Sequence, residues 1–309
     1  MAYYNSLLLF SFIVFINPIF SELCNPREKQ ALLQIKQYFR NPTILKSWKP
    51  STDCCESWEG ITCYTKTHHL RQSTNVTGPI QPSIAKLRLL MRLSLDLNSL
   101  TGSIPEFLTH LTRLTFVDLS YNRLTGSVPA RLSGLKHLTF LDLSSNKLTG
   151  EIPSSLSTLP SISMVRLERN RLTGSIPESF GNFLGNIPDL YLSNNKLSGK
   201  IPASLGKMNF GRVDFSGNKL EGDESMLFGS NKTSLIVELS RNLLAFDLSE
   251  VEFSKSLGVI TLDHNKITGS LPVGLCGEIP VGGALQTFDD TSYFHNRCLC
   301  GAPLASCKK

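Results

Sequence analysis

The feature that most restricts the fold of this chain is a motif that recurs about every 24 residues. The segments 116–129, 140–153 and 164–177 read FVDLSYNRLTGSVP, FLDLSSNKLTGEIP and MVRLERNRLTGSIP. They share the frame LxxLxLxxNxLxGxIP, which is registered too regularly to be a chance run of leucines. The asparagine of this frame recurs at Asn98, Asn122, Asn146, Asn170, Asn195, Asn218, Asn242 and Asn265.

Each part of the frame has a physical reason. The LxL alternation has the period of a strand, so its leucines share one face. The asparagine follows the strand, where its amide can bond backbone groups of the turn that would otherwise be buried unpaired. Glycine permits a tight bend, and proline stiffens the exit. Because one coil cannot bury its leucines alone, the sequence predicts stacked coils, an α/β solenoid of the leucine-rich-repeat type.

The cysteines lie at the two ends of the repeats, where the first and last coils need caps. The four cysteines at each end allow three pairings. We disfavour bonds between adjacent cysteines and between cysteines separated by a single residue. The favoured set is 24–54, 55–63, 276–298 and 300–307. No CxxC pair is present, so we predict no metal site. The expected disulfide cysteines are Cys24, Cys54, Cys55, Cys63, Cys276, Cys298, Cys300 and Cys307.

Residues 25–40 are predicted to form a capping helix. Asn25 is a good N-cap, Pro26 suits the first turn, and Glu28 gives a pattern like a capping box. We expect Leu32, Ile35 and Phe39 to form its apolar face, and Trp48 and Trp58 to cover the first coil.

The beginning of the chain is expected to direct export. The apolar run 7–20 has the length of a signal-peptide core, and Ser21 is a small residue suited to cleavage. No second long apolar run follows, so we expect a secreted monomer without a membrane span. The sequons at Asn75 and Asn231 are predicted N-glycosylation sites. The expected domains are a signal peptide (1–21), an N-terminal cap (22–63), a solenoid with eight clear coils (64–275) and a C-terminal cap (276–309).

Several segments together resemble one known family. ELCNPREKQALLQIK (22–36), CCESWEGITC (54–63), LEGDESMLFG (220–229) and CLCGAPLASCK (298–308) look like those of plant polygalacturonase-inhibiting proteins. The resemblance covers nearly all of the chain after the signal peptide. It implies a right-handed superhelix with disulfide-stabilised caps and a concave parallel sheet that carries the contact residues. It also implies a protein of the plant cell wall that inhibits fungal endo-polygalacturonases.

The sequence departs from the family pattern beside both caps. After Cys63, the segment 64–74 lacks the expected LxxLxLxx strand, although 77–90 looks like the end of a coil. Near the C-terminus, the Gly269–Pro272 and Gly277–Pro280 signatures are eight residues apart, where the repeat requires about 24. We therefore expect parts of the first and last coils to be missing.

Four of the eight outward positions of the predicted strands are acidic, although the chain has a net charge of +6. Neighbouring strands lie about 4.8 Å apart, so these acids should form a stripe. An enzyme that binds polygalacturonate presents cations beside its cleft, and complementary charge would speed the encounter. Apolar and aromatic residues would act as anchors. The predicted contact residues are Asp118, Phe140, Asp142, Met164, Arg166, Glu168, Asp189, Tyr191, Asp214, Glu238 and Asp263. Arg166 interrupts the acids and either affects which enzyme is recognised or pairs with Asp142 or Glu168.

A second row is basic and follows the ladder asparagines. It could hold pectin, a polyanion, but these residues could equally be ordinary exposed cations of the coil. The row comprises Arg123, Lys147, Arg169, Arg171, Lys196, Lys219, Arg241, His264 and Lys266.

Two other functions remain open. A soluble receptor-like protein that binds a peptide or hormone would share the coils. An ice-binding or structural wall protein would need a uniform row of Thr or Asn, whereas the outward positions vary in charge and size. The sequence contains no GxSxG, HExxH, P-loop or GxGxxG motif, so we predict neither an enzyme nor a cofactor. Its basic residues do not cluster with aromatics, which argues against nucleic-acid binding.

Overall fold

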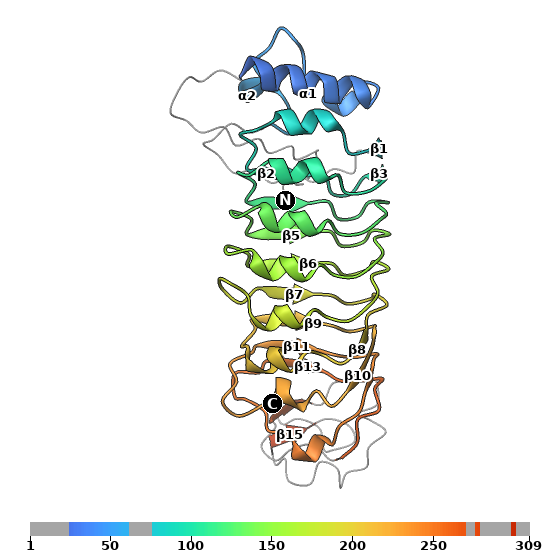
Figure 1. The fold of residues 1–309 in the computed structure, drawn as a ribbon, viewed down its shortest axis with the longest axis vertical. Coiled ribbons are helices and arrows are strands. Elements are labelled where there is room, and N and C mark those ends of the chain that lie inside the picture. The colour runs from blue at the N-terminus through green and yellow to red at the C-terminus, as the bar shows by residue number, and fades with distance from the viewer. Residues whose placement is uncertain (1–24, 62–75, 270–275, 279–297, 301–309) are drawn as a thin grey trace, which may run out of the picture. The chain divides into compact units, whose positions relative to one another are not determined.

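A computed structural model describes residues 25–61, 76–269, 276–278 and 298–300 (Figure 1). Two compact units are distinguished, and each is treated by itself below. The first comprises Met1–Arg171 with Phe183–Asn186, and the second comprises Leu172–Asn182 with Ile187–Lys309. Within the described ranges, no helix is both long and apolar enough to cross a membrane.

The first unit begins with a helical cap and continues as coils, each with a short strand and a 3-10 helix. The cap contains α1 (Pro26–Tyr38), η1 (Thr43–Leu45) and α2 (Cys54–Ser57). The coils contain β1 (Thr77–Pro79), η2 (Pro82–Lys86), β2 (Arg92–Ser94), β3 (Ser99–Thr101), η3 (Glu106–His110), β4 (Phe116–Asp118), η4 (Ala130–Gly134), β5 (Phe140–Asp142), η5 (Ser154–Thr158) and β6 (Met164–Arg166).

The second unit has the same alternation of strands and 3-10 helices. Its elements are η6 (Glu178–Gly181), β7 (Asp189–Tyr191), β8 (Ser198–Gly199), η7 (Ala203–Lys207), β9 (Arg212–Asp214), β10 (Lys219–Gly222), η8 (Ser225–Leu227), β11 (Ile236–Glu238), β12 (Leu243–Leu244), η9 (Leu248–Glu250), β13 (Val259–Thr261), β14 (Cys276–Glu278) and β15 (Cys298–Cys300).

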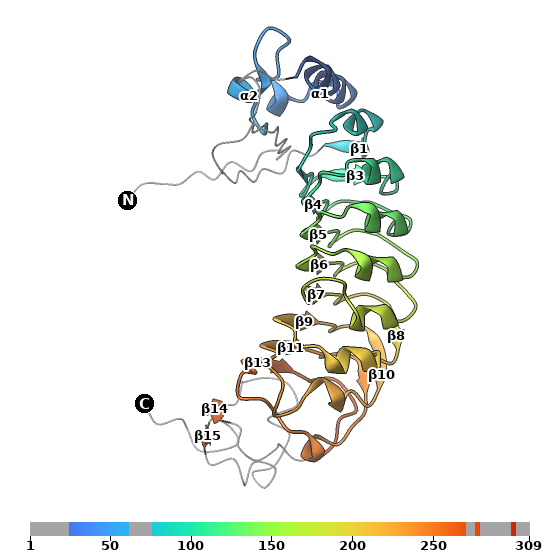
Figure 2. The same ribbon diagram turned by 60° about the vertical axis from the view of Figure 1, so that its left-hand side comes forward.

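The main strands of each unit pair in parallel and in the order of the chain. In the first unit β2 pairs with β4, β4 with β5, and β5 with β6. In the second unit β7 pairs with β9, β9 with β11, and β11 with β13. Within each unit these strands line one side and the 3-10 helices line the other (Figure 2). The predicted parallel sheet of a leucine-rich-repeat solenoid is thus confirmed.

The inward positions of the strands form the core. Val117, Leu141 and Val165 are register partners on neighbouring strands, and each is at most 1% exposed. The leucines that follow them, Leu119 and Leu143, are fully buried. Because the strand period sends alternate side chains to opposite faces, the outward positions are left for other contacts.

The ladder asparagines bond the backbone as predicted. The Nδ2 atom of Asn146 donates to the carbonyl oxygens of Leu119 at 2.9 Å, and of Leu143 and Ser144 at 3.1 Å. Its Oδ1 atom accepts the Leu124 N–H at 2.9 Å. One buried amide therefore satisfies backbone groups of its own coil and of the preceding coil. Asn122 and Asn170 repeat this arrangement.

The residue before each ladder asparagine adopts a left-handed backbone conformation, which the sequence analysis did not anticipate. Glycine adopts this region freely and Asn at low cost, whereas other residues are strained there. Gly217 and Asn194 occupy the position in two coils. The remaining residues, with φ between 51° and 56°, are Leu97, Tyr121, Ser145, Arg169, Arg241 and His264.

We predict that replacing Tyr121 with Val will destabilise the protein by about 1–2 kcal/mol, because a β-branched side chain is especially disfavoured at positive φ. Replacing Tyr121 with Asn should leave stability unchanged or slightly higher. The midpoint of denaturant unfolding measures both effects. Equal losses in the two variants would show that the lost tyrosine ring, and not the backbone, determines the result.

The cap helix forms much as predicted. Asn25 Oδ1 accepts the Arg27 N–H at 2.9 Å, and Leu32 and Ile35 are buried on its inner face. Trp48 and Trp58 are buried and stacked, with ring centroids 5.3 Å apart. The two tryptophans therefore belong to the core of the cap.

Glu28 has a role beyond the expected capping box. It is 4% exposed, and its Oε1 atom accepts the Leu89 N–H of the first coil at 3.3 Å. Burial raises the pKa of this carboxyl, an effect that the Leu89 hydrogen bond partly offsets. Glu28 thus joins the cap to the first coil.

The described cysteines agree with disulfide-bonded caps. Cys54 and Cys55 are both disulfide-bonded, whereas their favoured partners Cys24 and Cys63 lie outside the described residues. In the second unit β14 pairs in parallel with β15, and the Cα of Cys276 is in register with that of Cys298. The pairings remain predictions. Cys307 and Asn75 also lie outside the described residues, as does the whole of the predicted signal peptide.

Candidate functional site

The outward face of the first unit carries a stack of side chains at the starts of its strands. The Arg92 guanidinium carbon lies 3.8 Å from the centroid of the Phe116 ring. Phe116 in turn stacks on Phe140, with centroids 4.3 Å apart and ring planes 4° from parallel. Met164 is the register partner of Phe140 on the next strand. These half-buried side chains form a continuous apolar strip across neighbouring strands.

An acidic row lies two residues further along the same strands. Asp118 and Asp142 are register partners on β4 and β5. Asp118 accepts hydrogen bonds from the Ser120 N–H at 3.0 Å and its hydroxyl at 2.7 Å. Burial, with repulsion from Asp142, raises the pKa of Asp118 to about 6 even though Ser120 opposes the shift. Ser120 and its serine counterparts therefore orient these acids.

Two of the predicted acids are buried, which corrects the expectation of an open stripe. Asp142 is 4% exposed and Glu168 is 7% exposed. Arg166 covers them, with its guanidinium 3.5 Å from Asp142 and in direct contact with Glu168. The pairing alternative for Arg166 is therefore confirmed. Burial raises the pKa of both carboxyls, and Arg166 only partly offsets this.

The second unit carries its own outward cluster, centred on an arginine that the sequence analysis did not select. The Arg212 side chain pairs with Glu238 at 2.6 Å, and its guanidinium lies 5.1 Å from the ring centroid of Tyr191. The backbone N–H of Arg212 donates to Asp189 Oδ1 at 2.8 Å. Asp214 accepts the Ser216 N–H at 3.1 Å. On this face, one acid therefore forms an ion pair with Arg212, and two others accept hydrogen bonds from backbone N–H groups.

The face of the second unit ends in aliphatic residues. Ile236 and Val259 are register partners on β11 and β13. Val259 is 44% exposed, and the neighbouring Leu235 is 51% exposed. Asp263, the last predicted acid, bonds the His264 ring at 2.7 Å. Arg92, Arg212 and these aliphatic residues were not among the contact residues predicted from the sequence.

All nine residues of the predicted basic row are exposed. Four, Arg123, Lys147, Arg169 and Arg171, belong to the first unit, and the other five to the second. The His264 ring hydrogen-bonds the Asp263 carboxylate. The side chains of the row are therefore open to solvent. Asn231, the described sequon, is also exposed.

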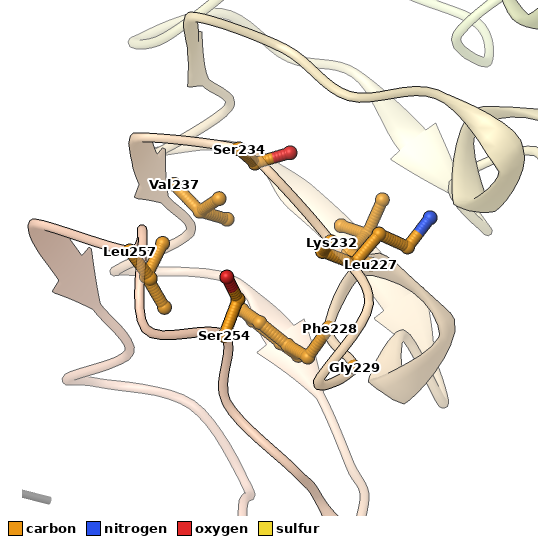
Figure 3. A pocket seen from close by; sticks show the side chains of 8 residues that line it. All are labelled: Leu227, Phe228, Gly229, Lys232, Ser234, Val237, Ser254 and Leu257. Carbon is orange, nitrogen blue, oxygen red and sulfur yellow. The ribbon is translucent and has the colours of Figure 1, made fainter.

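One small cavity lies among the described residues of the second unit. A cavity of about 10 Å³, lined by Leu227, Phe228, Ser234 and Ser254 among others, has room for one water molecule (Figure 3). Lys232 points out of it and donates to the Gly206 carbonyl oxygen. No cluster of three His, Cys, Asp or Glu suited to a metal ion occurs within the residues that the structure describes.

Comparisons with known proteins agree with this architecture. Leucine-rich-repeat family models match residues 88–148, 161–183 and 186–208, and a leucine-rich-repeat N-terminal domain model matches residues 25–64. The polygalacturonase inhibitor of Pyrus communis is 54% identical, with 97% of this chain and 96% of the relative aligned. That of Vitis vinifera is 56% identical over 94% of this chain and 93% of its own length.

A solved structure of a plant ice-binding protein is also similar, with 43% identity and a TM-score of 0.77 over 93% of this chain and 99% of that one. The repeats, the parallel strands and these matches define a leucine-rich-repeat protein. Within that class, the chain belongs to the plant polygalacturonase-inhibitor family.

The alignment with the Pyrus communis inhibitor also bears on the missing coil segments. It extends over 345 positions, 36 more than the 309 residues of this chain. The relative therefore has residues without a counterpart here. Where the missing segments lie in this chain stays a prediction.

Proposed function

We propose that this protein inhibits fungal endo-polygalacturonases by binding them through the outward faces of its parallel strands. The family membership carries the proposal, since several relatives that align over nearly the whole chain are polygalacturonase inhibitors. The protein performs no reaction of its own. It acts by occupying the surface around the enzyme's cleft.

The side chains on these faces suit such binding. An enzyme that binds polygalacturonate must present cations beside its cleft, so the acids that stay partly exposed, such as Asp118 and Asp214, increase the rate of encounter. Phe140 and Met164 in one unit, and Tyr191 in the other, supply apolar contact area, which usually carries affinity. Arg166 and Arg212 hold neighbouring acids in fixed positions before the enzyme arrives. Such preorganisation reduces the entropy lost on binding.

The same protein would act in the cell wall after secretion, as a monomer. Its exposed basic row would retain it on pectin through attraction between opposite charges. Such binding should weaken as salt is added, because exposed charges are screened. The receptor-like alternative has less support, since inhibitors of Pyrus communis and Vitis vinifera align with nearly the whole chain at more than 50% identity.

Ice binding is a second candidate, because one similar structure is that of a plant ice-binding protein. That activity favours a flat row of identical Thr or Asn side chains. The outward positions of this chain instead range from Asp118 through Arg166 to Tyr191. We therefore rank inhibition first, and an ice-recrystallisation assay separates the two candidates.

A reducing-end assay tests the proposed inhibition. The purified protein should slow the release of reducing ends from polygalacturonic acid by fungal endo-polygalacturonases. Heat-denatured protein at the same concentration is the control. An absence of inhibition across a broad panel of these enzymes would overturn the proposal.

A further inference from the structure

A groove of about 510 Å³ opens in the first unit away from the outward sheet face, between the end of α1 and β1. Tyr38 and Phe39 line it from the helix, with their rings edge to face and centroids 5.6 Å apart. Val76, Thr77 and Gly78 line it from the coil. Its volume falls within the range of about 300–1,000 Å³ that is usual for small-molecule sites.

Gly78 lines the groove next to Tyr38. Its φ of +102° is a conformation that side chains rarely adopt. A Cβ atom at this position would lie 3.6 Å from the Tyr38 ring and its hydroxyl oxygen. The Tyr38 ring is 47% exposed, and a Cβ atom at residue 78 would only make ordinary van der Waals contact with it. Val76, which also lines the groove, is buried.

A cation stands at the rim of this groove. Arg40 lines it and is exposed, and it has no ion-pair partner among the described residues. The backbone of Arg40 is nevertheless fixed, with φ at 57° and its N–H bonded to the Gln37 carbonyl oxygen at 2.9 Å. This left-handed conformation ends α1, because residues just after a helix C-cap commonly adopt it.

We propose that this groove binds a uronic acid unit of an acidic polysaccharide. The carboxylate pairs with the Arg40 guanidinium through charge-assisted hydrogen bonds. The apolar C–H face of the sugar ring packs on the exposed Tyr38 ring. The Thr77 hydroxyl donates to or accepts from a ring hydroxyl. This site is separate from the basic row and from the sheet face.

Site-resolved NMR titration with digalacturonate tests the proposal. We expect the amide signals of Gly78 and Arg40 to shift in the millimolar range. The dimethyl ester of digalacturonate, which keeps the rings and loses the charge, should bind about tenfold more weakly. Arg40→Gln should cause a similar loss. Arg27→Gln, an exposed arginine at the opposite end of α1, should leave the titration unchanged.

Equal binding of the ester and the free acid would overturn the proposal, as would no shift at Gly78 or an unchanged titration of Arg40→Gln. These outcomes are distinct from failure of the proposed inhibition. Arg40 lies off the sheet face, so Arg40→Gln should inhibit polygalacturonase as the native protein does. If the native protein inhibits polygalacturonase but does not bind digalacturonate in the groove, the groove proposal fails and the proposed inhibition stands.

Discussion

Replacing Asn146 with alanine is expected to lower the free energy of unfolding by about 3 kcal/mol or more. Asn146 is 9% exposed, and its amide bonds three carbonyl oxygens and one N–H of the backbone. Alanine would leave the buried Leu124 N–H without a partner and would remove one hydrogen bond from each of the three carbonyl oxygens, which keep another donor each. The unpaired N–H costs about 1–3 kcal/mol, and each lost hydrogen bond costs about 0.5–1.5 kcal/mol.

The measurement is equilibrium denaturation by urea, with far-UV circular dichroism as the readout. Asn186→Ala is the matched control, because Asn186 is exposed in the same unit. This control should change stability by less than about 0.5 kcal/mol. Equal effects of the two substitutions would contradict the role assigned to the asparagine ladder.

The second large effect is a loss of stability as the pH rises from about 5 to about 8, to which Glu224 should contribute about 2 kcal/mol. Glu224 is 1% exposed, its Oε1 atom accepts the Ile201 N–H at 3.0 Å, and its Oε2 atom has no partner. Burial raises its pKa from 4.5 to about 7, despite the Ile201 bond and the nearby Lys200. The folded state therefore favours the protonated form. Its stabilising contribution is complete below pH 4.5 and is lost as the pH rises to about 7.

Glu224→Gln keeps the acceptor for Ile201 and removes the ionisation, so the difference in stability between the two pH values should shrink. Glu221→Gln, an exposed glutamate on β10, should leave that difference as it is. Denaturant midpoints at both pH values measure the effect. Asp118 should also lower stability as the pH rises, because its pKa is raised to about 6. Some pH dependence should therefore persist in Glu224→Gln. An unchanged pH dependence in Glu224→Gln would show that ionisation of this carboxyl does not destabilise the folded protein.

The repeat frame alone was enough to predict most of the fold. Strand positions such as Phe116–Asp118, the buried leucines and the asparagine bonds all follow from a period of two and a fixed polar position. These features are local, and they repeat in many coils. The left-handed turn residues were also within reach of sequence analysis, since Gly217 and Asn194 stand at the same coil position as Tyr121.

Details of the candidate site could not be predicted in the same way. Whether Asp142 and Glu168 are open to solvent depends on the path of the Arg166 side chain, which the strand period does not specify. Stacking of Arg92 on Phe116 depends on the register between neighbouring strands. The burial of Glu28 depends on how the cap meets the first coil. Such contacts join residues far apart in the sequence.

The inhibition constant of a sheet-face variant tests the central claim most directly. Phe140→Ala removes an apolar anchor from the stack on β5 and should raise the inhibition constant for a sensitive endo-polygalacturonase about tenfold or more. Leu184→Ala removes a side chain that is 70% exposed and is not an outward strand residue, and it should inhibit as the native protein does. Circular dichroism confirms that both variants are folded. Undiminished inhibition by folded Phe140→Ala, or an equal loss in Leu184→Ala, would contradict binding through the sheet face.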